Sequence, residues 1–232
     1  MKIAVMGASG LIGTKVVEVL TAEGHDVVPA SRSSGVDVLT GAGLADALAG
    51  ADAVIDVTNS TAFEADAVME FFTTSATNLV NAAKAAGVGH YVALSIVGVD
   101  GLLDSGYFRA KVAQEKIITE SDIPYSIVRA TQFAEFTDAI AESLTVGDEV
   151  RVPDALIQPI RADEVAAAVA RAAVAEPRNG IENIGGPNKL TFEQMARDFL
   201  ARTHDGTKTI VVDPAARYFG AALARDSLVT ED

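Results

Sequence analysis

Three glycines near the start of the chain have the residue type and spacing that suit phosphate binding. The segment Gly7–Gly13 reads GASGLIG, follows the apolar run Lys2–Met6, and opens a helical pattern at Leu11. In such a turn the first glycine allows the sharp bend and the second lets the backbone approach the phosphates. The third lets the helix pack closely on the strand, while the helix N-terminus points free N–H groups at the anion. We therefore predict a site for a dinucleotide pyrophosphate rather than an ordinary glycine turn.

A second group of candidate cofactor contacts is Ser31, Arg32 and Ser33, at the end of the run Asp26–Ser31. An NAD-specific site would place Asp or Glu roughly 20 residues beyond the glycines, to bind the ribose 2′-hydroxyl. No acid stands there. Arg32 between two hydroxyl side chains could instead make charge-assisted hydrogen bonds to a 2′-phosphate. The alternative is an ordinary exposed loop arginine, but the position favours NADP(H) over NAD(H).

Tyr107 and Lys111 are four residues apart at the start of a helical pattern, so they share one helix face. A lysine ammonium beside a phenol lowers the phenol's pKa. The tyrosine could then exchange a proton with a carbonyl while the lysine holds a nicotinamide ribose. Ser95, which ends an apolar run, could hydrogen-bond the same oxygen. The pair alone is only mildly specific, and its position after the fifth predicted strand adds most of the weight.

Short β-branched runs alternate with helical patterns along the chain up to about Val150. The predicted strands are Lys2–Met6, Asp26–Ser31, Val36–Val38, Ala53–Val57, His90–Ser95 and Tyr125–Val128. The predicted helices are Leu11–Glu23, Leu44–Leu48, Ala65–Ala86, Tyr107–Glu120 and Phe133–Leu144. Because parallel strands need crossover connections, we predict an α/β fold with a Rossmann-like doubly wound parallel sheet and helices on both faces. Ligands of such folds bind at the carboxyl ends of the strands.

The pattern changes from about Val150 onward. Two extended pieces flank Pro153, a helix is predicted over Asp163–Ala175, and a short strand is predicted near Glu182–Ile184. Another helix follows Thr191, which has the character of an N-cap. We predict a single NAD(P)-binding Rossmann domain over residues 1–232, in which residues from about 150 to 232 contribute a small substrate lobe. That lobe would complete a cleft over the sheet edge.

Composition excludes several classes of site and partner. The chain has no cysteine, which removes disulfides, thiolate metal sites and a cysteine nucleophile. A net charge of −14 without a basic cluster argues against nucleic acid and anionic membranes as partners. Short apolar runs and the lack of a leader favour a cytoplasmic protein. No metal site is predicted, because His25, His90 and His204 are far apart in the sequence.

Taken in order, these motifs resemble the atypical short-chain dehydrogenases/reductases, and most closely their NmrA-like, NAD(P)H-binding group. The segments that carry the resemblance are Gly7–Gly13, the strand ending at Ser95, the pair Tyr107 and Lys111, and the runs Ile123–Arg129, Gln158–Ala166 and Asn183–Pro187. They extend over almost the whole chain, up to about residue 200. The resemblance implies a Rossmann fold, NADP(H) binding and often reduction of quinones or other carbonyl-like electrophiles.

The expected contacts follow from the turn, from strand order and from this resemblance. Asp37 and Val38 would lie near the adenine, and Thr58 and Asn59 would face the middle of the cofactor. The resemblance places Lys111 at the ribose and the segment after the Tyr125 strand beside the nicotinamide. The complete set of expected cofactor contacts is Gly7, Ser9, Gly10, Leu11, Ile12, Gly13, Ser31, Arg32, Ser33, Asp37, Val38, Thr58, Asn59, Leu94, Lys111, Ala130, Thr131, Gln132 and Phe133. The expected catalytic residues are Lys111, Tyr107 and Ser95.

The leading hypothesis is an NADPH-dependent oxidoreductase that transfers a hydride to a small quinone or carbonyl substrate. The first alternative is a non-catalytic NADP(H)-sensing regulator of the NmrA type, since the tyrosine position varies among NmrA-like relatives. A nucleotide-sugar epimerase or dehydratase is disfavoured, because only 12 positions separate Ser95 from Tyr107 and the lobe is small. Phe108 and Val112 lie together on a different face of the predicted helix from Tyr107. They could pack in the core, or they could form the contact surface of a homodimer.

Overall fold

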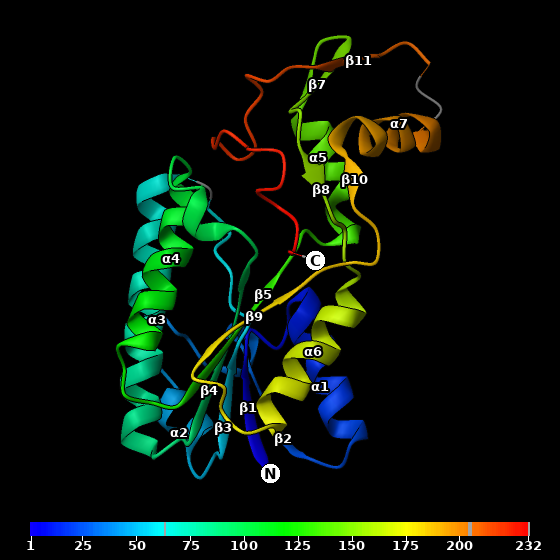
Figure 1. Cartoon of the computed structure of the whole chain (residues 1–232). Coiled ribbons are helices and arrows are strands. Elements are labelled where there is room, and N and C mark those ends of the chain that lie inside the picture. Colours follow the sequence, from blue (N-terminus) through cyan, green and yellow to red (C-terminus); the bar gives the residue numbers. More distant parts are fainter. Residues whose placement is uncertain (63, 204–205, 232) are drawn as a thin grey trace.

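A six-stranded parallel sheet lies between two layers of helices in the computed structural model, which describes residues 1–62, 64–203 and 206–231 (Figure 1). The strands stand in the order β2-β1-β3-β4-β5-β9. Their bounds are β1 Lys2–Met6, β2 Asp26–Ala30, β3 Ala53–Asp56, β4 His90–Ile96, β5 Tyr125–Ala130 and β9 Gly180–Ile184. The predicted Rossmann-like α/β sheet is confirmed.

Alternate residues of each central strand face opposite helix layers, which explains why these runs are continuously apolar. In β1, Ile3 and Val5 are fully buried toward one layer, and Ala4 and Met6 toward the other. The first layer contains α1 Leu11–Ala22 and α6 Ala162–Val174. The second contains α2 Leu44–Leu48, α3 Ala65–Ala86 and α4 Gly106–Thr119. Figure 1 shows α3 and α4 on one side of the sheet and α1 and α6 on the other.

The chain reverses its direction of winding at β1. It passes from β1 to its neighbour β2, and then crosses back to β3 on the other side of β1. Connections that leave in opposite directions open a crevice at the carboxyl ends of the two strands, and ligands bind there in open α/β sheets. The glycine turn follows β1, and Thr58 and Asn59 follow β3. The topology therefore brings these two segments to one crevice.

The predicted short strand Val36–Val38 is wrong. These residues lie in a loop after the short 3₁₀ helix η1 Arg32–Ser34. The Asp37 carboxylate accepts hydrogen bonds from Leu39 N at 2.8 Å and Thr40 N at 3.4 Å, so it folds the backbone back on itself. An aspartate that bonds its own chain two residues on favours a turn over an extended strand.

The expectation that the lobe takes in everything from about Val150 needs correction. Strand β9 pairs with β5 as the outermost strand of the main sheet, and α6 packs beside α1. The alanine-rich sequence of α6 explains this position, since small buried side chains such as Ala166 and Ala170 let the helix lie close to the sheet. Residues 162–184 thus complete the main sheet and one of its helix layers.

The lobe consists of the segments on either side of this insertion. They are α5 Thr137–Ser143, β6 Thr145–Val146, β7 Glu149–Val152, β8 Leu156–Ile157, β10 Leu190–Thr191, α7 Phe192–Thr203 and β11 Thr209–Val212. The predicted helix Phe133–Leu144 is the 3₁₀ helix η3 Ala134–Phe136 followed by α5. Thr191 caps α7 as predicted, because its Oγ1 accepts a hydrogen bond from Gln194 N at 3.0 Å.

The core of the lobe meets the sheet domain at the start of α4. Phe108 is 2% exposed and stacks on Tyr218, with ring centroids 6.2 Å apart. Of the two interpretations of Phe108, core packing is therefore correct. From Tyr218 the C-terminal segment returns toward the carboxyl end of β4, where a Cβ at Gly98 would lie 1.9 Å from the Ser227 carbonyl oxygen. Among the described residues, no helix combines the length and apolarity needed to cross a bilayer.

Candidate functional site

The glycine turn has the backbone geometry that its sequence predicts. Gly7 has a φ of +85°, and a Cβ at this position would lie 2.9 Å from the Val57 carbonyl oxygen. A Cβ at Gly13 would lie 2.1 Å from the Gly7 carbonyl oxygen, so the first turn of α1 packs on the loop at a distance that only glycine permits. Gly10, with a φ of −84°, precedes α1 as its N-cap. The N–H groups of the first turn of a helix lack intrahelical acceptors, and here that turn begins at Leu11, directly after the loop at the carboxyl end of β1.

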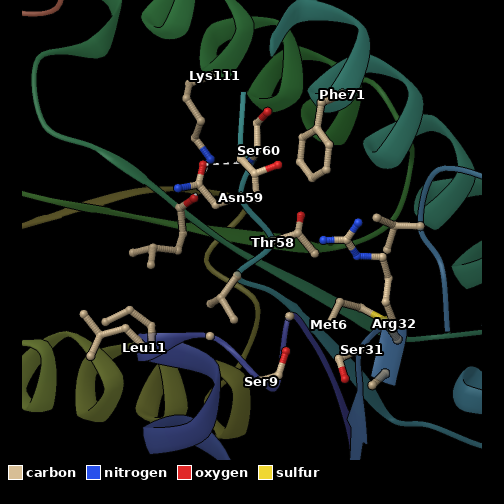
Figure 2. A pocket seen from close by; sticks show the side chains of 18 of the residues that line it. Met6, Ser9, Leu11, Ser31, Arg32, Thr58, Asn59, Ser60, Phe71 and Lys111 are labelled. Carbon is tan, nitrogen blue, oxygen red and sulfur yellow. Dashed lines mark hydrogen bonds between the residues drawn. The ribbon is translucent and has the colours of Figure 1, made fainter. Parts of the chain in front are cut away.

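A cavity of about 560 Å³ opens above this turn (Figure 2). Its volume lies within the range of small-molecule and cofactor sites. Most of the residues predicted from the sequence line it: Gly7, Ser9, Gly10, Leu11, Ile12, Ser31, Arg32, Asp37, Val38, Thr58, Asn59, Leu94, Ser95, Tyr107, Lys111 and Phe133. Phe71 and Phe136 also line the cavity, although the sequence analysis did not identify them. Both belong to apolar helical patterns, in which a pocket-facing side chain cannot be told from a core one.

Five predicted contacts do not line the cavity: Gly13, Ser33, Ala130, Thr131 and Gln132. Gly13 is packed beneath the turn, and Thr131 Oγ1 donates a hydrogen bond to the Gln158 carbonyl. Ser33 Oγ is 2.8 Å from Ser31 Oγ. Gln132 is buried, and its amide nitrogen and oxygen have no hydrogen-bond partner among the described residues. Two unsatisfied polar atoms of this kind normally require a ligand or water.

Arg32 extends from the end of β2 into the cavity (Figure 2). The short 3₁₀ helix that begins at Arg32 fixes the backbone position from which this side chain extends. Ser34 Oγ accepts a hydrogen bond from Ser31 N at 2.9 Å and donates one to the Ser31 carbonyl, also at 2.9 Å. The backbone around Arg32 is therefore held in a closed turn, and the guanidinium is the positive group at this end of the cavity. It could bind a phosphate in a forked geometry.

The tyrosine and lysine of α4 share a helix face as predicted, but each has a different partner. Tyr107 Oη donates a hydrogen bond to Asn59 Oδ1 at 2.9 Å. Lys111 Nζ donates to the Leu94 carbonyl at 2.9 Å and to Gln114 Oε1. Burial raises the pKa of Tyr107 to about 12. The prediction that Lys111 lowers this pKa is thus wrong, and the phenol stays protonated as a hydrogen-bond donor.

Ser95 and Lys111 complete the polar floor of the cavity. Ser95 is 4% exposed, and its Oγ has no hydrogen-bond partner among residues 1–62, 64–203 and 206–231. Lys111 Nζ lies 4.6 Å from the centroid of the Phe72 ring. Burial lowers the pKa of Lys111 to about 8, while the negative charges of Asp56 and Glu115 act in the opposite direction. Lys111 is therefore a cation with a proton that it can lose near neutral pH.

Asp56 is a buried member of the site that the sequence analysis missed. It is the last residue of β3 and 1% exposed. Its carboxylate accepts hydrogen bonds from Tyr91 Oη and Gln114 Nε2, each at 2.9 Å. The other oxygen accepts bonds from Thr58 N at 3.1 Å and Thr58 Oγ1 at 2.7 Å. An acid inside the apolar run AVIDV was a signal in the sequence, because a buried charge requires partners.

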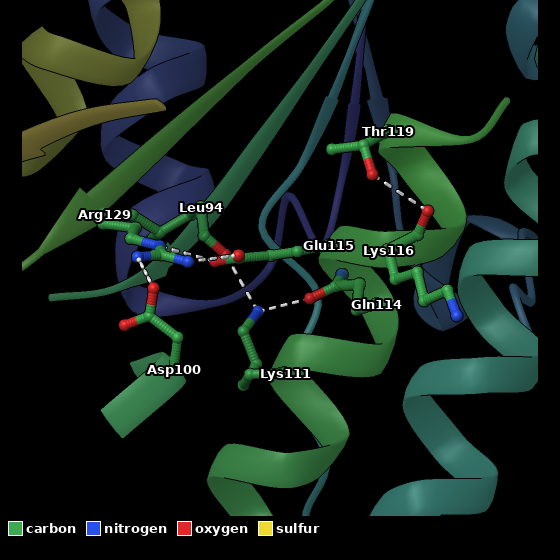
Figure 3. A network of polar contacts seen from close by, with 8 residues as sticks. All are labelled: Leu94, Asp100, Lys111, Gln114, Glu115, Lys116, Thr119 and Arg129. Carbon is green, nitrogen blue, oxygen red and sulfur yellow. Dashed lines mark hydrogen bonds and ion pairs between the residues drawn. The ribbon is translucent and has the colours of Figure 1, made fainter. Parts of the chain in front are cut away.

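An ion-pair network anchors α4 to the sheet (Figure 3). Arg129 of β5 donates to the two carboxylate oxygens of Glu115 at 2.9 and 2.6 Å. Its third nitrogen bonds Asp100 at 3.0 Å. The side chains of Arg129 and Glu115 are each only 9% exposed. Because α4 carries both Tyr107 and Lys111, this forked pair sets the distance of the helix from the carboxyl ends of β4 and β5.

Replacing Glu115 with glutamine should lower the free energy of unfolding by about 2 kcal/mol, the scale of a hydrogen bond to a charged group. The loss follows because, within the described part of the chain, the buried Arg129 guanidinium keeps only Asp100 as a charged partner. Urea denaturation measures it. The matched control is Asp100→Asn, which neutralises an acid that is 66% exposed and should cost under about 1 kcal/mol. Equal losses in the two variants would contradict the anchoring role of Glu115.

No group of three or more metal-ligating side chains lies together in the part of the chain that the structure describes. His90 Nε2 is 2.9 Å from Ser126 Oγ within the sheet, and burial lowers its pKa. His25 Nε2 lies 3.9 Å from Glu23 Oε2. His204 lies outside the described residues. Asp163 pairs with Lys15 at 2.6 Å, and Glu164 accepts a hydrogen bond from Arg161 N, so both acids stabilise the start of α6.

Residues 7–176 match the NAD(P)H-binding family. The matched region contains the glycine turn, Arg32, the Ser95 strand and the helix with Tyr107 and Lys111. The chain belongs to this family. The predicted resemblance to the NmrA-like group of the atypical short-chain dehydrogenases/reductases is confirmed. The chain is an NAD(P)H-binding protein, as predicted. A search of the curated proteins found no match.

Solved structures of the same fold include several enzymes. A dTDP-4-dehydrorhamnose reductase ortholog from Clostridium acetobutylicum is 19% identical with a TM-score of 0.75, over 98% of this chain and 91% of that one. The triphenylmethane reductase of a Citrobacter species, complexed with NADP(H), is 19% identical with a TM-score of 0.64, over 93% and 80%. An NADPH-dependent quinone oxidoreductase from Escherichia coli is 21% identical with a TM-score of 0.63, over 91% and 78%. At these identities the similarity establishes the shared fold.

Proposed function

We propose that the protein is an NADPH-dependent oxidoreductase that transfers a hydride to a small quinone or carbonyl substrate. The observation that supports this most is the continuity of one cavity. Its lining runs from the glycine turn and Arg32 at one end to Ser95, Tyr107 and Lys111 at the other. Anion-binding groups and proton-donating groups therefore share one space, as a two-part cofactor and its substrate require.

Each group has a distinct role in the proposed reaction. The amides at the start of α1 bind the pyrophosphate, Arg32 binds the 2′-phosphate and Lys111 binds the nicotinamide ribose. Bound NADPH supplies the hydride. Tyr107 donates a proton to the acceptor oxygen as negative charge develops on it, and Ser95 Oγ hydrogen-bonds the same oxygen. The Ser95 hydroxyl is buried and has no hydrogen-bond partner among the described residues, which supports this role because it has hydrogen-bonding capacity to offer.

Two of the fold relatives support the class of substrate. One is described as an NADPH-dependent quinone oxidoreductase and the other as a triphenylmethane reductase that binds NADP(H). The direct test is to follow NADPH oxidation in the presence of the purified protein and a panel of quinones and aldehydes. Turnover of NADPH with at least one acceptor is the expected result.

Arg32 provides the test of cofactor preference. Arg32→Glu should weaken NADPH binding roughly tenfold to a hundredfold, because it removes a charge-assisted contact and adds repulsion. NADH lacks the 2′-phosphate, so its dissociation constant should change far less. Fluorescence titration with each cofactor measures both constants. Lys116→Glu is the control, since it makes the same charge change at a side chain that is 71% exposed at the far end of α4. Equal weakening of NADPH and NADH by Arg32→Glu would contradict the assignment.

A second candidate function is a non-catalytic NADP(H) sensor. The observation that favours it is the pairing at α4, where Asn59 holds the Tyr107 hydroxyl while Leu94 and Gln114 hold the Lys111 amine. In this arrangement the phenol and the amine do not act on one another. NADPH binding without oxidation by any acceptor of the panel would support the sensor. With either function, we propose a cytoplasmic protein that can form a homodimer.

A further inference from the structure

Asp56 is 1% exposed, and among the residues that the structure describes no arginine or lysine is hydrogen-bonded to its carboxylate. Within these residues its four hydrogen-bond donors are the Tyr91 hydroxyl, the Gln114 amide, and the Thr58 backbone and hydroxyl. All of these donors are neutral. A buried carboxylate held only by neutral groups is costly, because desolvation of a charge is repaid best by an opposite charge. A positively charged side chain close to Asp56 would therefore stabilise its carboxylate.

Gln114 connects this carboxylate to the candidate site. Its Nε2 donates to Asp56 Oδ2 at 2.9 Å, so its Oε1 must point in the other direction, where it accepts a hydrogen bond from Lys111 Nζ. An amide has one donor end and one acceptor end. The bond to Asp56 consequently fixes which end faces the lysine. Figure 3 shows the Lys111 amine between Gln114 and the Leu94 carbonyl.

We propose that Asp56 is a positioning residue for Lys111, which it holds in place through Gln114 and keeps in the charged form that binds the cofactor ribose. The inference rests on the proposed function, in which Lys111 binds that ribose. Asp56 belongs to β3, beside the turn that receives the cofactor, whereas Lys111 belongs to α4. A carboxylate on β3 thereby influences the charge state of Lys111 on α4, which lines the cavity.

The other groups around Lys111 leave Asp56 as the main source of negative charge. Glu115 lies on the same helix, but it is neutralised by its forked pair with Arg129. Asp100 also pairs with Arg129. Burial raises the pKa values of Tyr91 and Tyr107, so both phenols are neutral. The Phe72 ring adds attraction for a cation without a charge.

The pH dependence of cofactor binding follows from the burial of Lys111. Burial lowers its pKa to about 8, and the ammonium form is the one that donates hydrogen bonds to the ribose. Affinity should therefore be complete below this pKa and fall as the pH rises through it. For a pKa near 8, binding of NADPH should weaken roughly tenfold between about pH 7 and pH 9. This range lies above the pKa of the 2′-phosphate, near 6.

The test is a series of NADPH fluorescence titrations from about pH 7 to pH 9.5 with the wild type and Asp56→Asn. Removing the carboxylate charge disfavours the ammonium, so the midpoint should move to lower pH. A shift of about one unit would weaken binding roughly fivefold at pH 8. Asp52→Asn is the matched control, because it makes the same change at the exposed opposite end of the β3 region. The control should keep the wild-type midpoint.

A second background separates positioning from a general effect on the fold. Lys111→Met should bind NADPH more weakly and without the pH midpoint. In that background Asp56→Asn should have no further effect, because the group through which it acts is gone. If Asp56→Asn does not fold, Gln114→Met replaces it, since it cuts the link and should also lower the midpoint.

The outcomes distinguish the inference from the function on which it rests. Failure of the wild type to bind NADPH at any pH would overturn the proposed function. Wild-type binding with a midpoint that Asp56→Asn and Gln114→Met leave in place would overturn only the role of Asp56. An additive loss from Asp56→Asn in the Lys111→Met background would do the same, because Asp56 would then act independently of the lysine.

Discussion

Replacement of Gly10 with alanine is expected to weaken NADPH binding roughly a hundredfold, or about 2.7 kcal/mol, while the protein stays folded. A Cβ at Gly10 would meet the Gly7 carbonyl oxygen at 3.3 Å, a contact that a shift of a few tenths of an ångström relieves. Gly10 has a φ of −84°, which alanine also adopts. The cost to the free protein is thus small, whereas the added methyl group stands where the pyrophosphate must approach the backbone.

Two other glycines, Gly13 in the same turn and Gly24 beyond the end of α1, serve as comparisons for this result. Gly13→Ala should lower both stability and binding, because its Cβ would lie 2.1 Å from the Gly7 oxygen. Gly24→Ala, just past the end of α1, should cost about 1 kcal/mol of stability through its φ of +84° and leave NADPH affinity unchanged. Thermal unfolding and fluorescence titration measure the two effects separately. Wild-type affinity in Gly10→Ala would contradict the placement of the pyrophosphate at this turn.

Local pattern was sufficient to predict most of the sheet and its helices. The helices Leu44–Leu48 and Ala65–Ala86 have the predicted bounds, and the predicted strands at Lys2, Asp26, Ala53, His90 and Tyr125 all form. Buried parallel strands and amphipathic crossover helices have distinct periods, so each element carries its own signal. Gly87 illustrates the end signals, since it closes the long helix with a φ of +70°.

Tertiary pairing was the part that local pattern could not supply. Val36–Val38 is β-branched like a strand, yet the Asp37 side chain makes a turn there. Strand β9 looked like part of a lobe because it comes late in the chain, and only its pairing with β5 assigns it to the main sheet. Whether a segment forms a strand, and in which sheet, depends on the residues that it packs against. Those residues are distant in the sequence, so a short run alone does not predict the outcome.

The same distinction applies within the site. Helical spacing correctly placed Tyr107 and Lys111 on one face of α4, but their partners come from elsewhere in the chain. Asn59 lies in the loop after β3, Leu94 belongs to β4, and Gln114 lies in the next turn of α4. Asn59 and Leu94 belong to the predicted set of contacts, whereas Gln114 and Asp56 do not. Of these, Asp56 was the most accessible to prediction, as an acid within a buried strand.

Tyr107→Phe is expected to lower turnover with a quinone or aldehyde acceptor by a factor on the order of 10² to 10⁴, the contribution of a general acid. The substitution removes only the hydroxyl that donates to Asn59 at 2.9 Å. The ring contacts with Phe72 and Phe108, each with centroids 5.9 Å apart, are kept. NADPH affinity should consequently change little, and the loss should appear in kcat. Steady-state kinetics together with fluorescence titration separate the two quantities.

The charge state of Tyr107 sharpens this prediction. Burial raises its pKa to about 12, so the phenol remains a proton donor throughout the working range of the protein. The tyrosine should then contribute no pH midpoint to kcat between about pH 6 and pH 10, and any midpoint near pH 8 in cofactor affinity belongs to Lys111. Tyr125→Phe is the control, since that residue begins β5 at the amino end of the sheet. Unchanged turnover in Tyr107→Phe would remove the phenol from catalysis. The hydroxyl would then serve to hold Asn59, and the non-catalytic sensor would become the better account of the cavity.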